Sequence, residues 1–293
     1  MTSVKRRNHD LAERLRGYLD QYAVYRGRLR RSYDVETVHR MRVLTRRLRT
    51  LLDLTRRVKD KKIAHTAKTA LIEFRRLGRL LGDSRGLDVS AICLRRLYGA
   101  RYPQCAARLG RDLIRRRKNN YQADLTKLVG LIDGSACRRR LCAKSFPAKF
   151  SDDVLSNLLP SQVKKIQNKL RRTLERPVAL SKDLERLHRV RILVKKLRYN
   201  LENLSETYSH RPCYLNMLKL KKLQRVLGNW HDEAVLLDWI KKTSLKGVPK
   251  RSAVRLEYSS LLSDATRRES QLRQRAILVF RRCASKKIFR EKP

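Results

Sequence analysis

A helix-forming segment with cations on one side and leucines on another occurs twice in this chain of 293 residues. The two copies are VHRMRVLTRRLR, at residues 38–49, and LHRVRILVKKLR, at residues 187–198. On a helix of about 3.6 residues per turn, each copy separates an apolar seam from a cationic row. The first row consists of His39, Arg42, Arg46 and Arg49, and the second of His188, Arg191, Lys195 and Arg198. The rows are offset by 188 − 39 = 149 positions and match in charge type, which indicates an internal duplication.

A second pair of matching segments supports the duplication. The pattern L-x-x-x-L-G ends at Gly82 in the first half and at Gly228 in the second, an offset of 228 − 82 = 146 positions. The difference of three positions between the two offsets fits one loop deletion. Cations accompany both copies of this pattern: Arg75 and Arg79 in the first, and Lys221, Lys222 and Arg225 in the second.

Amphipathic periodicity and the placement of proline and glycine predict an all-α protein, with no strand. In the first half we expect helices at 9–31, 35–58, 61–81 and 87–131, the third ending at Gly82 as a C-terminal cap and the fourth broken near 101–103. In the second half we expect them from 152 towards 177, from 181 to before 212, from 215 to 227 with its end at Gly228, and from 230 onwards with a break at 247–249. This order predicts two pseudo-symmetric four-helix bundles, 1–134 and 152–293, each with its own core and joined by a linker at 135–151.

The net charge is the strongest compositional signal. Lysine and arginine number 73 against 27 acidic residues, which gives +46, while 41% hydrophobic residues suffice for a folded core. A folded chain with this much self-repulsion is expected to bind a polyanion. DNA, RNA, an anionic membrane surface and an inorganic polyanion are the candidates.

The cysteines and the apolar runs indicate the compartment. Six cysteines occur without a C-x-x-C pair, and the first residues, MTSVKRRNHDLAERL, contain basic residues but no apolar segment typical of a secretion signal. No apolar run approaches the roughly 18 residues that a membrane span requires. We therefore expect a soluble, cytoplasmic protein with reduced thiols.

These motifs resemble those of the CHAD family, the conserved histidine α-helical domain. Its first motif, H-x-x-R-x-x-x-[RK]-[RK]-L-R, matches residues 39–49 and 188–198, and its second, L-x-x-x-L-G-x-x-x-D, matches residues 223–232. In the segment LGDSRGLDV, Gly86 replaces the acid that the family usually has after the arginine. The resemblance implies an all-α fold of two four-helix bundles. It also implies that inorganic polyphosphate binds in a basic central channel lined by both motif helices.

The cationic rows suit a phosphate chain chemically. Arginine presents a planar fork that can bind two oxygens at once, and each row repeats every three or four residues, about 5–6 Å along the helix axis. Two such rows could clamp a linear polyphosphate, whereas the alternative is a solvated basic surface on the side of each helix away from the core. The predicted binding residues are His39, Arg42, Arg46, Arg49, Arg75, Arg79, His188, Arg191, Lys195, Arg198, Lys221, Lys222 and Arg225.

No catalytic or metal-binding pattern accompanies these rows. The sequence has no Walker A loop, no G-x-S-x-G, no H-E-x-x-H and no paired carboxylates among the cations. We therefore predict a binding protein with no cofactor and no metal. His231 and Asp232 are expected in a loop after Gly228, where a capping role is favoured over joint action. Whether His65 joins the site stays open.

Three aromatic residues, Tyr199, Trp230 and Trp239, are expected in the core.

Other functions remain open. Sequence-independent binding of DNA or RNA is the main alternative, because +46 alone would predict it, although aromatic residues are only 6% and no helix-turn-helix or zinc module is visible. A structural protein of polyphosphate granules would use the same site with an additional partner surface. Membrane-surface binding is disfavoured because the basic rows belong to helices that carry a core-facing seam.

Overall fold

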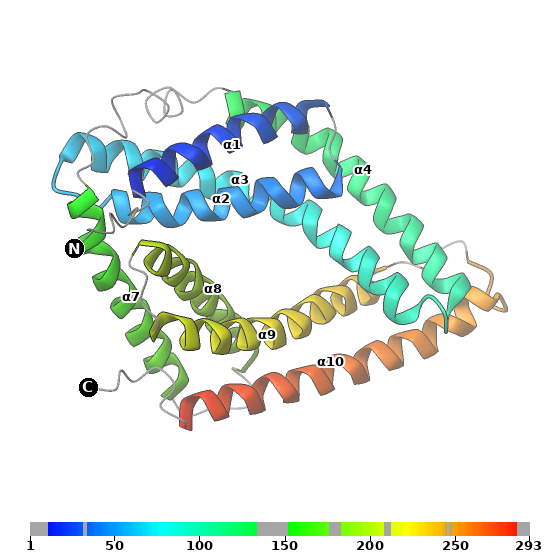
Figure 1. Ribbon diagram of the computed structural model, residues 1–293. Helices are drawn as coiled ribbons and strands as arrows, with labels where there is room; N and C mark the ends of the chain where they lie inside the picture. The colour runs from blue at the N-terminus through cyan, green and yellow to red at the C-terminus, as the bar shows by residue number, and fades with distance from the viewer. Residues whose placement is uncertain are drawn as a thin grey trace, which may run out of the picture.

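The protein is all-helical. The structure, a computed structural model, describes residues 11–31, 34–133, 152–175, 183–207, 212–243, 245 and 248–285. Within these residues its regular secondary structure is α-helix throughout, which confirms the predicted fold class (Figure 1). The helices are α1 (Leu11–Arg31), α2 (Val35–Thr55), α3 (Lys61–Tyr98), α4 (Pro103–Asp133), α7 (Asp152–Glu175), α8 (Asp183–Thr207), α9 (Pro212–Lys242) and α10 (Ala253–Ser285).

Successive helices pack against each other in the same order in both halves of the chain. Helices α1, α2, α3 and α4 follow one another in contact, as do α7, α8, α9 and α10, and α3 also packs against α9 (Figure 1). Four helices per half agree with the expected order. The predicted linker at 135–151 falls outside the described residues, so the boundary between the halves stays a prediction.

Aspartate caps set the starts of α2 and α3. The carboxylate of Asp34 accepts a hydrogen bond of 2.7 Å from the backbone N–H of Thr37. Asp60 accepts two such bonds, at 2.8 Å from Lys62 and 3.1 Å from Ile63. Each cap satisfies donors that a helix start leaves unpaired, and contributes about 1 kcal/mol to the free energy of unfolding. The cap at Asp34 thereby fixes the start of α2, which carries the first cationic row, and the cap at Asp60 fixes the start of α3, which packs against it.

The hydrophobic cores are shared between the halves rather than divided between them. One core cluster contains residues of α1, α2, α7 and α8, the first parts of α3 and α9, and the end of α10. The other contains α4, the second parts of α3 and α9, and the first part of α10. The expectation of a separate core for each half therefore differs from the structure. The reason is the length of α3 and α9, 38 and 31 residues, because each runs through both clusters.

The predictions that helices end at Gly82 and Gly228 are wrong. Helix α3 continues from Gly82 to Tyr98, and α9 continues from Gly228 to Lys242. A Cβ atom added at Gly82 would lie 3.1 Å from Nη1 of Arg42 on α2, so this glycine gives room to an arginine instead of capping a helix. A Cβ at Gly228 would meet no atom within 4 Å. A glycine inside a helix costs about 1 kcal/mol relative to alanine, which buried neighbours offset.

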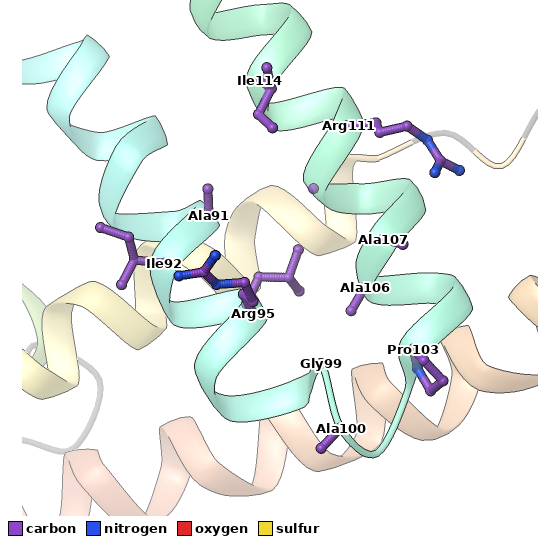
Figure 2. Close-up of a pocket in the computed structure, with 12 residues that line it drawn as sticks. Ala91, Ile92, Arg95, Gly99, Ala100, Pro103, Ala106, Ala107, Arg111 and Ile114 are labelled. Carbon is purple, nitrogen blue, oxygen red and sulfur yellow. The ribbon is translucent and has the colours of Figure 1, made fainter. Parts of the chain in front are cut away.

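An apolar groove lies between the end of α3 and the start of α4 (Figure 2). Its volume is about 770 Å³, and its walls include Ile92, Leu94 and Ile114, with Arg95 and Arg111 among the lining residues. None of the predicted binding residues lines it. Its largely apolar walls do not suit a polyanion, so the site has to be sought at the cationic rows.

None of the helices in the described part of the chain combines the length and the apolar character needed to cross a bilayer.

Candidate functional site

The two cationic rows meet at one tyrosine ring. Arg46 of α2 donates a hydrogen bond of 2.5 Å from Nη1 to the hydroxyl of Tyr199 on α8. The guanidinium carbon of Arg46 lies 5.2 Å from the centroid of the Tyr199 ring, and that of Arg198 lies 4.5 Å from the same centroid. Tyr199 is buried, as predicted, and it also joins the rows by cation–π contacts.

The first row packs closely against α3. Nη1 of Arg42 donates a hydrogen bond of 3.4 Å to the carbonyl of Gly78, and a Cβ at Gly78 would lie 3.1 Å from Nη1 of Arg49. Burial, with the neighbouring guanidiniums of Arg46 and Arg85, lowers the pKa of Arg42 to about 10. Gly78 of α3, which has no side chain, therefore leaves room for Arg42 and Arg49, both of which remain charged at neutral pH.

Arg49 extends this charge cluster to two further predicted residues. Burial is the main cause that lowers the pKa of Arg49, followed by repulsion from Arg75, Arg46 and Arg79. The structure thus places Arg75 and Arg79, both exposed on α3, in the same electrostatic environment as the first row.

The second row contains buried hydrogen-bond donors for which the described part of the chain offers no acceptor. Within the described residues, the buried Nε atoms of Arg191 and Arg198 have no hydrogen-bond partner. Arg198 also forms an ion pair of 3.2 Å with Glu202. Burial lowers the pKa of Arg191, the carboxylate of Asp232 on α9 opposes this shift, and Arg46 on α2 adds to it. An anion between α2 and α8 would face donors from both rows.

Lys195 lies within the combined field of both rows. Burial and repulsion from Arg191 and Arg46 lower the pKa of its amine to about 7, while Asp232 opposes the shift and Arg42 adds to it. Three helices, α2, α8 and α9, contribute these groups. The effect of Arg42 and Arg46 on a lysine of α8 agrees with the contact between Arg46 and Tyr199, which brings the rows together.

The histidines lie at the edge of this cluster. Burial, and then repulsion from Arg85, lowers the pKa of His39. Burial, followed by Arg191 and Lys195, lowers the pKa of His188. The ring centroid of His188 lies 5.5 Å from that of His231. Burial is also the main cause that lowers the pKa of His231, to about 4. These imidazoles are therefore neutral at neutral pH in the free protein.

His231 and Asp232 lie inside α9 and not in a loop, which corrects the sequence-based expectation. Both are half-buried and face the second row. By the offset of 146 positions, Arg85 and Gly86 occupy the equivalent places in the first half (231 − 146 = 85 and 232 − 146 = 86). The second row thus has a carboxylate beside it where the first row has a glycine.

A family model for the CHAD domain matches residues 13–241, a range that contains both rows. The protein belongs to the CHAD family. Two solved structures have a similar fold. The CHAD domain from the plant Ricinus communis has a TM-score of 0.62 and 20% identity, over 93% of this chain and 92% of that one. PptA from Streptomyces chartreusis has a TM-score of 0.62 and 18% identity, over 94% of this chain and 98% of that one. A comparison with curated proteins finds no match.

The remaining predicted residues of this CHAD protein lie further out. Lys221, Lys222 and Arg225 are exposed on α9, and their role in binding stays a prediction. His65 is exposed on α3. Across the described part of the chain, no group of three or more histidine, cysteine or acidic residues is arranged to hold a metal ion.

Sequence reasoning did not assign Arg85, His231 or Asp232 to the site. A signal for the last two was present. If the helix is continued through Gly228, residues three and four positions later fall on the same face of the helix as that glycine. Because we expected the helix to end at Gly228, His231 and Asp232 were not placed on the same helix face as the glycine of the CHAD motif.

Proposed function

We propose that this CHAD protein binds inorganic polyphosphate along the cationic rows of α2 and α8. The observation that carries the proposal is the convergence of Arg46 and Arg198 on the ring of Tyr199. It supports a shared binding region with cations on two sides. CHAD domains as a family are linked to polyphosphate binding, and the matched range contains every predicted binding residue.

The electrostatics of the rows favour a highly charged linear anion. Burial and mutual repulsion disfavour the charged forms of Arg42 and Lys195 in the free protein. A polyanion in contact with these groups would offset the repulsion between them and restore the charged form of Lys195. Each phosphate supplies oxygens that can pair with an arginine fork.

We further propose that the site binds and does not catalyse. Asp232 is a half-buried carboxylate beside the second row, and burial raises its pKa. A single carboxyl group of this kind among arginines disfavours the divalent cations that phosphoanhydride hydrolysis commonly uses. Association with polyphosphate granules in the cytoplasm is the cellular role that such a binder would suit.

Competition between ligands tests this proposal against its main alternative. Fluorescent long-chain polyphosphate is bound to the protein at fixed salt and displaced with unlabelled polyphosphate, single-stranded RNA or duplex DNA. Concentrations are compared per phosphate, because a net charge of +46 attracts any polyanion. We expect polyphosphate to compete at concentrations at least about tenfold lower than either nucleic acid. Equal or stronger competition by nucleic acid would identify the alternative function.

A further inference from the structure

The apolar groove between the end of α3 and the start of α4 has no part in the proposed polyphosphate site. None of the predicted binding residues lines it, and its lining includes Leu94 and Ala106 of the second core cluster, to which α2 and α8 do not contribute. We propose that this groove binds an amphipathic helix of a partner protein, whose apolar face is bordered by acidic residues on both sides.

Two large apolar side chains are exposed where they line the groove. Ile92 of α3 is 45% exposed and Ile114 of α4 is 63% exposed. Most of the other lining residues are small, such as Ala91, Ala107 and Gly110, and they leave a groove of about 770 Å³ (Figure 2). An exposed apolar hollow of this kind marks a site for an apolar partner surface.

The length of the groove suits a helix of about three turns. Its lining residues extend from Ala91 to Gly99 on α3 and from Pro103 to Ile114 on α4. At a rise of about 1.5 Å per residue these distances are about 12 Å and about 17 Å. A helix that lies along the groove, with a pitch of about 5.4 Å, would insert side chains spaced three and four positions apart.

Arginines border the groove on both sides. Arg95 of α3 and Arg111 of α4 are exposed, and Figure 2 shows their side chains on opposite sides of the groove, directed away from each other. A fatty acid would need a cation at one end of the groove, because its single charge lies at the end of its chain. Cations on both long sides instead match a helix that has acidic residues along both borders of its apolar face.

No acid of the groove walls neutralises these two arginines. The only acidic residue between positions 91 and 114 is Asp112, which pairs with Arg108 at 3.6 Å and also with Arg115. Among the described residues, neither of the two bordering arginines forms an ion pair. Their guanidiniums are therefore available to carboxylates of a partner.

The charge of the chain disfavours an occupant from the chain itself. A second copy would bring a further net charge of +46 to a groove bordered by arginines. The segments outside the described residues are basic as well: residues 134–151 contain five cations and no acid, and residues 286–293 contain four cations and one acid. An acidic helix from a different protein is the occupant with complementary charge.

The groove is preformed, because both of its helices are anchored near the connecting turn. The hydroxyl of Tyr98, at the end of α3, donates a hydrogen bond to the carboxylate of Glu233 on α9. The hydroxyl of Tyr102, just before α4, donates one of 2.6 Å to Asp264 on α10, and α9 and α10 pack against each other. A partner helix would therefore bind without the entropic cost of ordering the walls.

Occupation of the groove and of the rows at the same time would connect polyphosphate to the partner protein, a consequence that rests on the proposed function. The two sites have no residue in common, because the groove is lined only by residues 91–114. The groove would thus supply the partner surface that a protein of polyphosphate granules needs.

The test uses a synthetic helix as the probe. It has about 14 residues, with leucines spaced three and four positions apart on one face, glutamates along both borders, and a hydrocarbon staple on the outer side, because a free peptide of this length is marginally helical. The control peptide has the same composition and staple, but its leucines are distributed around the helix. Binding to the full chain is measured by fluorescence anisotropy at about 150 mM salt. We expect the patterned peptide to bind at least about tenfold more tightly than the control. Equal affinities would overturn the proposal, because the net charge alone would explain them.

A matched pair of variants tests the apolar wall. Ile114→Asn removes an exposed apolar side chain from the groove, and Leu256→Asn removes one that is 67% exposed on α10. Circular dichroism establishes that both variants are helical. We expect about tenfold weaker binding of the patterned peptide by Ile114→Asn and a change of less than about twofold by Leu256→Asn. Equal losses would contradict binding in the groove.

A second matched pair tests the arginine borders at constant net charge. One variant combines Arg95→Gln with Arg111→Gln, and the other combines Arg96→Gln with Arg116→Gln, at exposed positions of the same helices that do not line the groove. The first should bind the patterned peptide about tenfold more weakly, and the second less than about threefold. If both lose affinity equally, the arginines do not recognise acidic borders and the proposed partner chemistry is wrong.

The other possible occupants are outcomes of the same experiments. Displacement of the patterned peptide by palmitate would assign the groove to fatty acids. A dimer in sedimentation velocity that Ile114→Asn dissociates would assign it to a second copy of this chain. Either result would overturn the proposal.

Polyphosphate binding is measured separately, so that the two proposals can fail independently. Ile114→Asn should leave the affinity for polyphosphate unchanged. Selective binding of the patterned peptide without polyphosphate binding supports the groove and removes the proposed function. Polyphosphate binding without a preference for the patterned peptide does the reverse.

Discussion

Arg46 and Tyr199, which lie 153 positions apart, are joined by a hydrogen bond of 2.5 Å between the guanidinium and the phenol hydroxyl. This bond connects the helices of the two motif copies at the centre of their cationic rows. It holds one cation of α2 in place while the ring also contacts Arg198 of α8. The ring thereby fixes the relative position of groups that sequence alone shows only as two separate patterns.

Tyr199→Phe should weaken polyphosphate binding while the fold remains. The ring and its cation–π contacts stay, but Arg46 loses its hydrogen bond and becomes less ordered. We expect about threefold weaker binding and a loss of about 1 kcal/mol in the free energy of unfolding, measured by calorimetric titration and urea denaturation. Tyr18→Phe is the control, because Tyr18 contacts Arg47, outside the rows, and should leave affinity unchanged. Equal effects of both substitutions on affinity would contradict the role of Tyr199.

Glycine-to-alanine substitutions at the equivalent positions Gly82 and Gly228 should have different effects. A methyl group at Gly82 displaces the end of Arg42, a flexible side chain, and should weaken polyphosphate binding with little change in stability. A methyl group at Gly228 meets open space, and the higher helix propensity of alanine should raise the free energy of unfolding by about 0.5–1 kcal/mol. Urea denaturation and ligand titration of both variants check this. Unchanged binding by Gly82→Ala would show that Arg42 needs no such room, and weaker binding by Gly228→Ala would contradict the expected difference between the two glycines.

The role of Gly82 could not be predicted from the sequence, whereas the fold could. Periodicity predicts the two rows and the all-helical fold, and the structure confirms the fold. Trp230, which we expected in the core, is buried. A glycine after a leucine pattern is typical of a helix end, but at Gly82 the cause is the close approach of Arg42, a long-range contact that local sequence does not encode. Because we expected helices to end at Gly82 and Gly228, we did not predict that His231 lies beside the second row. For the same reason we did not predict that each hydrophobic core contains residues of both halves.

Affinity for polyphosphate should rise as pH falls, in two separate ranges. A bound polyanion raises the pKa of Lys195 above its free value of about 7. Above the bound-state pKa the amine is neutral in both states, and below about pH 7 it is charged in both, so its contribution appears between these limits. His39 and His188 have lowered pKa values in the free protein, so their contribution begins below the ordinary histidine value and extends upwards to the pKa that each has in the bound state. For each of these groups, a tenfold rise in proton affinity on binding corresponds to about 1.4 kcal/mol of binding free energy.

Titration with long chains, which have few titrating ends, measures these ranges separately. Lys195→Arg keeps a cation that does not titrate, and should abolish the pH dependence above about pH 7. The double variant His39→Gln, His188→Gln should retain that part and lose the part at lower pH. The groups that face Lys195, namely Arg42, Arg46, Arg191 and Asp232, are unchanged in both variants. An unaltered profile in Lys195→Arg would show that this lysine is not coupled to binding.

Lys195→Met should stabilise the free protein while it weakens binding. The pKa of Lys195 in the folded state lies below its value in the unfolded chain, so protonation disfavours folding. This destabilisation is complete below about pH 7 and disappears as pH rises towards about 10.4. With allowance for solvent screening, we expect a gain of about 1–2 kcal/mol in the free energy of unfolding at pH 7, and little gain near pH 10. Lys241→Met, at an exposed position, is the control. A gain that does not depend on pH would assign the effect to packing instead of charge.

The most direct test of the account compares two variants that lose the same charge. One replaces Arg42, Arg49, Arg191 and Arg198 with glutamine, and the other replaces four exposed arginines outside the rows, Arg116, Arg171, Arg251 and Arg281. Circular dichroism establishes that both are helical, and the affinity for long-chain polyphosphate is then measured at one salt concentration. The rows predict at least about a hundredfold loss for the first variant and less than about tenfold for the second. Equal losses would contradict the central claim, because they would mean that polyphosphate binds a diffuse basic surface and not the paired rows of α2 and α8.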